Sequence, residues 1–524
     1  MFLKLKRDGR LKARLVADGR PQAWFGTEMD ISSPTASAES VFVTLTIDAT
    51  ENREVAIADI EGAYLEASME EEVHVELDEE LSALLIELVP EWLPYLRANR
   101  KLVLLLLKAL YGCTQSARLF YNLLAKTLIA MGFVANPYDR CVFNKTIDGL
   151  QCTIVIYVDD LKISCVSSVV VDNVIKELQQ YFTKLTIKRG KQLEYLGMEL
   201  DFTALGCVSL SMSKMVEECV NEVVVDRTAS TPAANYLFKV NDDCAKLSKE
   251  KRERFHSMVA KLLYLAKRGR PDILTVVSFL TTRVLCADED DWKKLERVIA
   301  YLKGTADLVL KLQGDDLCEI HAYVDASHAV HPDAKSQTGV TITLGRGAVL
   351  CKSSKQKLVA KSSTVAELVA LSEGMDYVMW IKQFLKAQGF HMKPVVVHQD
   401  NKSTIFLAEK GKAINQKTRY LDIRYFAVTD LIDKKEIRIK YTETENMIAD
   451  YFTKPLQGKL FCRMRELIVN EMKKRADAPH DGTWNEAVEN KAVDTKTRKP
   501  ENPKFHAQGC VAPVRRSETP VISK

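Results

Sequence analysis

The sequence has no apolar run long enough to cross a membrane. Its longest leucine-rich stretch, Leu102–Leu107, has the length of a buried strand, whereas a membrane-spanning helix needs about 20 apolar residues. The N-terminal residues are charged throughout and lack the apolar centre of a secretory signal. We therefore expect an intracellular protein with no membrane partner.

Cysteine pairs of the kind that bind zinc are also missing. The 12 cysteines are scattered from Cys113 to Cys510, with no CxxC pair and no regular spacing to histidine. In a reducing compartment such thiols act as small apolar side chains. We expect neither a structural zinc site nor disulfides.

An excess of one charge is missing as well, because 74 Lys and Arg face 70 Asp and Glu, a net charge of +4. The apolar share of 47% and the charged share of 27% exclude collagen, coiled coil and wholesale disorder. The first twenty residues are nevertheless basic, which fits either a nucleic-acid contact or a solvated hairpin. An acidic run over 70–80 predicts a surface loop.

The length of 524 residues predicts about three domains. Residues 1–205 mix β-branched strands with amphipathic helices, which indicates an α/β or α+β unit, and residues 206–315 look mostly helical. Residues 316–475 have the order three strands, a long helix over about 364–388, a strand, two helices, a strand and a closing helix. The tail, 476–524, is rich in proline and poor in apolar residues, and we predict disorder there.

The most specific local feature is a pair of aspartates, Asp159 and Asp160, between two apolar, β-branched segments in TIVIYVDDLKISC. Two adjacent carboxylates repel each other unless a cation lies between them. An ordinary polar hairpin turn is the alternative. A third acid, Asp59, follows the short apolar strand 55–58. Three carboxylates of this kind are what two-metal catalysis needs, so the pattern favours a magnesium site.

Six motifs now occur in one order along the chain: KARLVADG (12–19), DIEGAYL (59–65), KALYGCTQSAR (108–118), YVDDL (157–161), YLGMELD (195–201) and RPDI (270–273). With these motifs the chain, from Lys4 to about residue 460, resembles the polymerase and ribonuclease H portion of a copia-type LTR retrotransposon polyprotein. The resemblance implies a multidomain α/β and α+β protein. It would be a right-hand polymerase, with fingers and palm over 1–205 and a thumb or connection over 206–315, followed by a ribonuclease H-like domain over 316–475.

The resemblance gives each acid of the first cluster a role. Asp59, Asp159 and Asp160 match the triad that holds two Mg²⁺ (or Mn²⁺) ions, activates the primer 3′ hydroxyl and binds the incoming triphosphate. Tyr64 matches the aromatic residue under the incoming sugar, which implies a preference for deoxynucleotides. A tyrosine of the core is the alternative interpretation.

Four further residues match substrate-binding positions of the family. Gln115 falls beside the nascent base pair, and Arg14 falls in the motif that reaches the triphosphate, with a solvated arginine as the alternative. Leu196 and Gly197 match the primer-grip turn, where a glycine lets two backbones approach closely.

A second set of acids follows the ribonuclease H order. Asp325 ends a strand in AYVDASHA, Glu367 begins the long helix in STVAELVAL, Asp400 ends a strand in VVVHQDNKS, and Asp450 lies in IADYFTKPL. The resemblance implies that they hold two further Mg²⁺ (or Mn²⁺) ions for phosphodiester hydrolysis. Two alternatives stay open: Glu367 completes a capping box with Thr364, or Asp400 belongs only to a turn.

Several features depart from a complete polyprotein. Tyr420 stands where the family usually has a histidine, and the sequence shows no zinc knuckle, protease or integrase motif. The chain also starts almost inside the fingers, so we expect a truncated piece of an element.

The resemblance implies an RNA-directed DNA polymerase with an attached ribonuclease H. Its partners would be an RNA template, a DNA or tRNA primer, deoxynucleoside triphosphates and RNA–DNA hybrids. The implied location is the cytoplasm, with virus-like particles and the nucleus as further settings, and the oligomeric state stays open. The alternative is an impaired relic that only binds nucleic acid.

Overall fold

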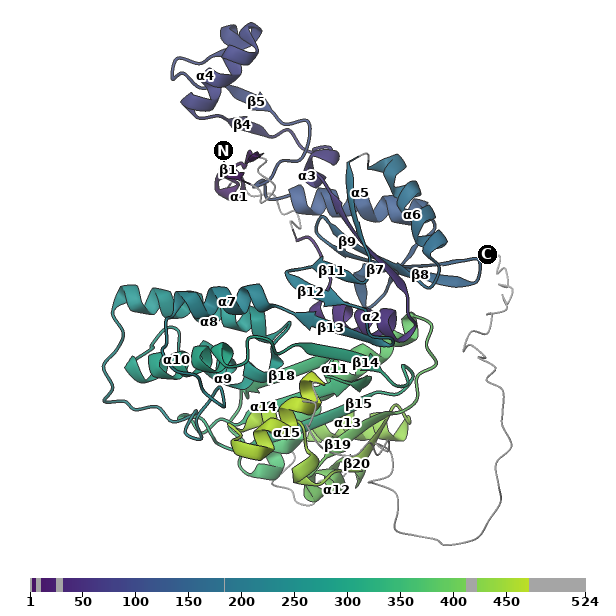
Figure 1. Cartoon of the computed structure of the whole chain (residues 1–524), viewed down its shortest axis with the longest axis vertical. Coiled ribbons are helices and arrows are strands. Elements are labelled where there is room, and N and C mark those ends of the chain that lie inside the picture. The colour runs from purple at the N-terminus through teal and green to yellow at the C-terminus, as the bar shows by residue number, and fades with distance from the viewer. Residues whose placement is uncertain (1, 6–10, 25–31, 183, 411–421, 471–524) are drawn as a thin grey trace, which may run out of the picture. The chain divides into compact units, whose positions relative to one another are not determined.

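The computed structural model describes residues 2–5, 11–24, 32–182, 184–410 and 422–470 (Figure 1). All of them fall in one compact unit, Met1–Glu471. The predicted tail, 476–524, lies outside the described residues. None of the helices within these ranges has the length and apolar character needed to span a membrane. The mixed α/β character expected from the sequence is confirmed.

A six-stranded sheet forms the first half of the unit, in the order β10-β3-β9-β8-β7-β6. Its strands are β3 (Glu54–Ile60), β6 (Val134–Asn136), β7 (Asp139–Ile147), β8 (Leu150–Tyr157), β9 (Asp160–Cys165) and β10 (Leu185–Arg189). The centre of β8 is buried on both faces, which explains its run of Cys, Thr, Ile and Val without polar alternation. Helices α2 (Ala38–Thr50), α5 (Ser116–Ala130) and α6 (Ser168–Tyr181) contribute to the same core.

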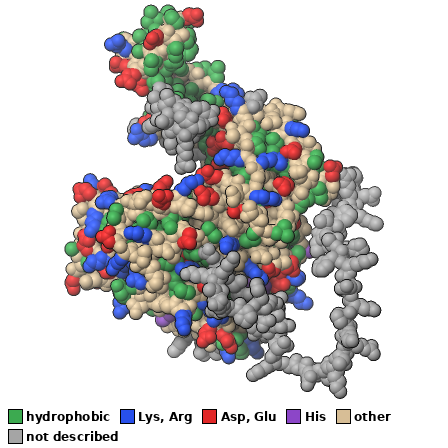
Figure 2. Space-filling view, in the orientation of Figure 1, with side chains coloured by type: hydrophobic (Ala, Val, Ile, Leu, Met, Phe, Trp, Pro, Cys, Tyr) green, Lys and Arg blue, Asp and Glu red, His purple; other side chains and the backbone are tan. Residues whose placement is uncertain are grey.

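The structure departs from the sequence prediction at the acidic run. Residues 70–80 are not simply a surface loop, because they contain β4 (His74–Glu76), which pairs with β5 (Val103–Leu105), and the start of α4 (Glu79–Leu88). Asp78 caps α4 by accepting a hydrogen bond from the Leu81 N–H, so one acid of this run serves the helix N-terminus. Together with η1 (Pro90–Tyr95) these elements form a projection that carries exposed apolar side chains (Figures 1 and 2).

Four short elements in the described part of the chain precede the projection. They are β1 (Phe2–Leu5), β2 (Leu11–Arg14), α1 (Arg20–Trp24) and α3 (Ala63–Glu66). Strands β1 and β2 pair antiparallel, as expected for a hairpin in the basic N-terminal segment.

A second sheet has the order β11-β12-β13-β14-β17. Its strands come from distant parts of the chain: β11 (Gln192–Tyr195), β12 (Met198–Asp201), β13 (Cys207–Ser211), β14 (Leu310–Gly314) and β17 (Gly345–Arg346). It therefore draws strands from all three blocks proposed from the sequence. The division at 205 and 315 stays a prediction.

Between β13 and β14 the chain is helical, as predicted. The helices are α7 (Ser213–Glu222), α8 (Lys249–Ala266), η2 (Pro271–Ile273), α9 (Leu274–Thr281) and α10 (Glu289–Lys303). A capping box between Asp288 and Asp291 starts α10. We call residues 206–315 the connection block.

A third sheet, β18-β16-β15-β19-β20, positions the second set of acids. Strands β15 (His321–Ser327), β16 (Gln337–Thr343) and β18 (Leu350–Lys355) are antiparallel, and β19 (Val395–Gln399) and β20 (Ile437–Tyr441) run parallel to β15. Helix α11 (Ser363–Ala387) packs on β15 and β16. The remaining elements are α12 (Lys402–Lys410), α13 (Asp422–Asp433), η4 (Thr444–Asn446), α14 (Asp450–Thr453) and α15 (Gly458–Val469).

Candidate active sites

Antiparallel pairing brings the first three acids together. Asp59 on β3 lies directly opposite Asp160 on β9, and Asp159 occupies the turn between β8 and β9. The Ile60 N–H donates to the Asp159 carbonyl at 3.2 Å, which ties the turn to β3. Val158 enters the turn at φ 60°, a left-handed conformation that is strained for a β-branched residue and occurs mostly at functional sites.

Electrostatics supports the closeness of these three carboxylates. The pKa of Asp160 is raised to about 6, first by burial and then by the charges of Asp159 and Asp59. A cation placed among them would offset this repulsion. Their spacing is nevertheless looser than that of the second cluster, because the three do not form a group whose ligand atoms all lie within 4.8 Å of one another.

Tyr64 lies beside this first cluster. Gly62, at φ 71°, lets the chain turn into α3, which carries the tyrosine. The ring contacts Tyr111, with 4.3 Å between ring centroids. The Tyr64 pKa is raised by partial burial and by the charge of Asp159. The tyrosine thus packs against the core within electrostatic reach of Asp159, and its place under the incoming sugar stays a prediction.

The other substrate-binding candidates are more dispersed. Gln115 is buried, and its amide nitrogen lies 4.0 Å from the Met69 sulfur. Leu196 (φ 52°) and Gly197 (φ 73°) form the two-residue turn between β11 and β12, the geometry of a tight hairpin. Arg14 ends β2, but its side chain lies outside the described part of the chain.

The Leu196–Gly197 turn has a partner that the sequence did not indicate. The hydroxyl of Tyr264, on α8 of the connection block, donates to the Leu196 carbonyl at 3.1 Å. The Arg268 guanidinium lies 3.6 Å from the centre of the Tyr264 ring. The turn is therefore held against a helix from a different part of the chain.

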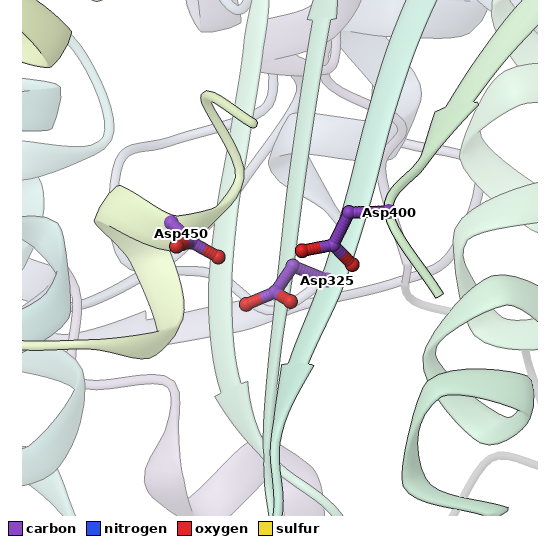
Figure 3. A group of neighbouring side chains, drawn as sticks. All are labelled: Asp325, Asp400 and Asp450. Atoms are coloured by element: carbon purple, nitrogen blue, oxygen red, sulfur yellow. The ribbon is translucent and has the colours of Figure 1, made fainter. Parts of the chain in front are cut away.

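The second cluster is the most compact group of acids in the described residues. Asp325, Asp400 and Asp450 each offer a carboxylate oxygen, and these oxygens lie within 4.8 Å of one another. Figure 3 shows the three side chains converging from a central strand, a strand end and a short helix. Asp325 and Asp450 are only 1% and 3% exposed, so their charges are poorly screened by water.

Glu367 lies next to this group, on the first turns of α11. It is 6% exposed and accepts a hydrogen bond from the Gln399 side chain at 3.4 Å. Burial, followed by the charges of Asp325 and Asp400, raises its pKa to about 10. The capping-box alternative is wrong, because Ser362 is the N-cap of α11 and accepts from the Val365 N–H. Glu367 is too far along the helix to cap it.

Asp400 does lie in the short link between β19 and α12, but it does not cap that helix. The Asn401 side chain accepts from the Thr404 N–H at 3.1 Å and takes that role for α12. Asp400 instead accepts a hydrogen bond from the Thr444 hydroxyl at 2.8 Å, which leaves its carboxylate at the cluster.

Lys454 is a residue of this site that the sequence analysis missed. Its ammonium lies 2.7 Å from Asp450 and 3.8 Å from Asp325. The pKa of Asp450 is raised to about 7 by burial and by Asp325, while Lys454 opposes the rise. Lys454 follows Asp450 by four residues, and this spacing, which places side chains on one helix face, was the available signal.

The donor set fits divalent cations. Four carboxylates, three of them buried, offer hard oxygen ligands of the type that Mg²⁺ and Mn²⁺ prefer. Burial first and neighbouring acids second raise the pKa values of Glu367 and Asp450, and Lys454 only opposes this rise. Tyr420, the departure from the family pattern, lies outside the described residues.

Comparison with known proteins finds a matching family model and similar polyproteins. Residues 2–234 match the family model described as "Reverse transcriptase (RNA-dependent DNA polymerase)". The chain is 28% identical to the "Retrovirus-related Pol polyprotein from transposon TNT 1-94" of Nicotiana tabacum, over 89% of this chain and 35% of that protein. It is 26% identical to the "Transposon TyH3 Gag-Pol polyprotein" of Saccharomyces cerevisiae, over 87% of this chain and 26% of that protein.

The chain thus spans about a third or less of the length of these relatives. Among solved structures, a prototype foamy virus protease–reverse transcriptase aligns with 84% of this chain and 49% of its own, at 14% identity and a TM-score of 0.23. The family match covers residues 2–234, and over most of its length the chain is similar to retrotransposon Pol polyproteins.

Proposed function

We propose that this chain is an RNA-directed DNA polymerase that also hydrolyses the RNA strand of RNA–DNA hybrids. The observation that carries the proposal is the presence of two acid clusters on two different sheets, one at the β3/β9 pair and one at the β15/β19 ends. Its substrates would be an RNA template, a DNA or tRNA primer, deoxynucleoside triphosphates and the hybrid product.

At the polymerase site, Asp59, Asp159 and Asp160 would bind two divalent cations. Bound there, such cations would lower the pKa of the primer hydroxyl and neutralise the triphosphate. The protein's part would be to hold these three carboxylates near the ends of neighbouring interior strands of the sheet. The Tyr64 ring, beside Asp159, would fill the space under the sugar and select against a 2′ hydroxyl.

At the hydrolytic site, a second pair of divalent cations would bind Asp325, Glu367, Asp400 and Asp450. They would supply an activated water and stabilise the leaving oxygen. The Gln399 side chain orients Glu367, and it also accepts from the backbone N–H groups of residues 400 and 401. This glutamine therefore links two of the four acids.

Two matched variants test the proposal on a primer annealed to an RNA template. Asp159→Asn should abolish primer extension with Mg²⁺ and leave cleavage of a labelled hybrid intact. Asp325→Asn should leave primer extension intact and abolish cleavage of the labelled hybrid. Equal extension by Asp159→Asn and the parent would refute the polymerase site.

A third outcome would favour a protein that only binds nucleic acid. In that case the unmodified protein neither extends the primer nor cleaves the hybrid with Mg²⁺ or Mn²⁺. It nevertheless binds a primer–template, as a gel-shift experiment would show. Binding through the phosphate backbone should weaken steeply as salt is raised, so the shift should be repeated across a salt series.

A further inference from the structure

Helix α14, which carries Asp450, is too short to satisfy its own backbone. A helical carbonyl normally accepts from the N–H four residues later. For the Tyr451 carbonyl that residue is Pro455, which has no N–H. For the Phe452 carbonyl it is Leu456, whose N–H bonds to the Lys454 carbonyl instead.

Two hydroxyl side chains from outside the helix replace these missing donors. Ser353 lies on β18 of the third sheet, and its hydroxyl donates to the Phe452 carbonyl at 2.6 Å. Thr275, on α9 of the connection block, donates to the Tyr451 carbonyl at 2.7 Å. Both are buried, and an unsatisfied buried carbonyl is unfavourable. Each of the two residues that follow Asp450 is thus held by a hydroxyl from another element.

On the side of the connection block, a network of buried hydrogen bonds holds Asp272, which contacts Tyr451. The Tyr451 hydroxyl donates to the Asp272 carbonyl at 3.1 Å. The Asp272 side chain accepts two hydrogen bonds from Arg270, at 2.9 and 2.8 Å, and one from Tyr301 at 2.7 Å. Arg270 and Asp272 are each 1% exposed. The RPDI motif therefore contains a buried ion pair, Arg270–Asp272, and the Asp272 carbonyl binds the side chain of Tyr451, the residue that follows Asp450.

We propose that Thr275 is a positioning residue for Asp450, so that the acid cluster on the third sheet is completed only when the connection block packs against α14. This inference rests on the proposed hydrolytic function of that cluster. Thr275 touches none of the four acids and acts through the Tyr451 carbonyl. It is expected to affect metal affinity at the cluster and to leave the polymerase site unaffected.

The test uses the full chain with Thr275→Val, which keeps the shape of the side chain and removes the hydroxyl. We expect the Mg²⁺ concentration for half-maximal hybrid cleavage to rise about 3- to 10-fold, with the KM for hybrid and primer extension unchanged. Thr275→Ser should restore the parental value, because it restores the donor. Thr281→Val is the matched control, since the Thr281 hydroxyl bonds only within α9, to the Ser278 carbonyl.

A second readout does not depend on activity. Mn²⁺ binding is measured by calorimetry in an Asp59→Asn/Asp159→Asn background, where the third-sheet cluster is the remaining high-affinity candidate. Thr275→Val should weaken this binding by a similar factor. If the background protein binds Mn²⁺ and Thr275→Val binds it equally well, the positioning role is overturned and the proposed function stands. If the parent neither binds Mn²⁺ at this cluster nor cleaves hybrid, both are overturned.

Discussion

A carboxyl group buried beside other acids retains its proton, and Glu367 is the clearest case in this chain. Its pKa is about 10 in the folded protein against an ordinary value of 4.5, because of burial and then Asp325 and Asp400. Between these two pH values the unfolded state releases a proton that the folded state keeps. The metal-free protein should therefore lose stability as the pH rises through this window, and the effect should vanish below the lower value.

Glu367→Gln removes this dependence because glutamine has the shape of the protonated acid. In the presence of a chelator we expect the variant to be more stable than the parent by about 1–3 kcal/mol at pH 8 and equally stable at pH 4. Urea unfolding at both pH values measures this difference. Glu253→Gln, on the exposed surface of α8, is the control. A stability difference that does not change with pH would contradict the assignment.

At single positions the sequence predicted acids better than it predicted their partners. Asp59, Asp160 and Asp325 were found because each adjoins an apolar, β-branched segment, although Asp59 and Asp325 lie within β3 and β15 and not beyond their ends. Lys454 and Gln399 were missed because their importance depends on which distant acids they face. The roles of all the site residues stay predictions.

At the scale of elements, α14 approaches β16 closely because of Gly339. This glycine lies opposite Asp325 in the β15–β16 register. A Cβ at this position would come 2.6 Å from the Ala449 carbonyl oxygen and 2.7 Å from a Thr453 side-chain carbon. We expect Gly339→Ala to displace α14, to lower stability by about 1–3 kcal/mol and to weaken Mg²⁺-dependent hybrid cleavage. Primer extension by the variant at 25 °C serves as the internal control. If Gly339→Ala cleaves hybrid with the same Mg²⁺ dependence as the parent, the result would count against this packing.

Most elements were predictable, and the exceptions have a physical reason. The helix at 363–387 follows from its apolar spacing, and each of its observed ends differs from the predicted end by one residue. Strand β17 has no strand signal of its own, because Gly345–Arg346 becomes a strand by pairing with β14, more than thirty residues earlier. Strand β4 was hidden in the same way, since its apolar signal is one valine among charged residues.

At the scale of the whole molecule, the second sheet joins the parts that carry the two acid clusters. It draws strands from residues 192–346. Further hydrogen bonds cross between the parts, from Gln151 to the Gln388 carbonyl at 2.7 Å and from the Gly314 N–H to Thr50 at 3.1 Å. Periodicity indicates some of the strands but not this order, so the sequence suggested separate blocks where the fold has a shared sheet.

A shared sheet implies that the two activities should be lost together on heating. Leu312, at the centre of β14, is fully buried, and Leu312→Ala should lower stability by about 2–5 kcal/mol. Because β14 pairs with both β13 and β17, we expect the temperatures at which primer extension and hybrid cleavage disappear to fall by the same amount. Leu285→Ala, at a site that is 87% exposed, should change neither temperature. A fall in one temperature alone would show that the two parts unfold independently despite the sheet that connects them.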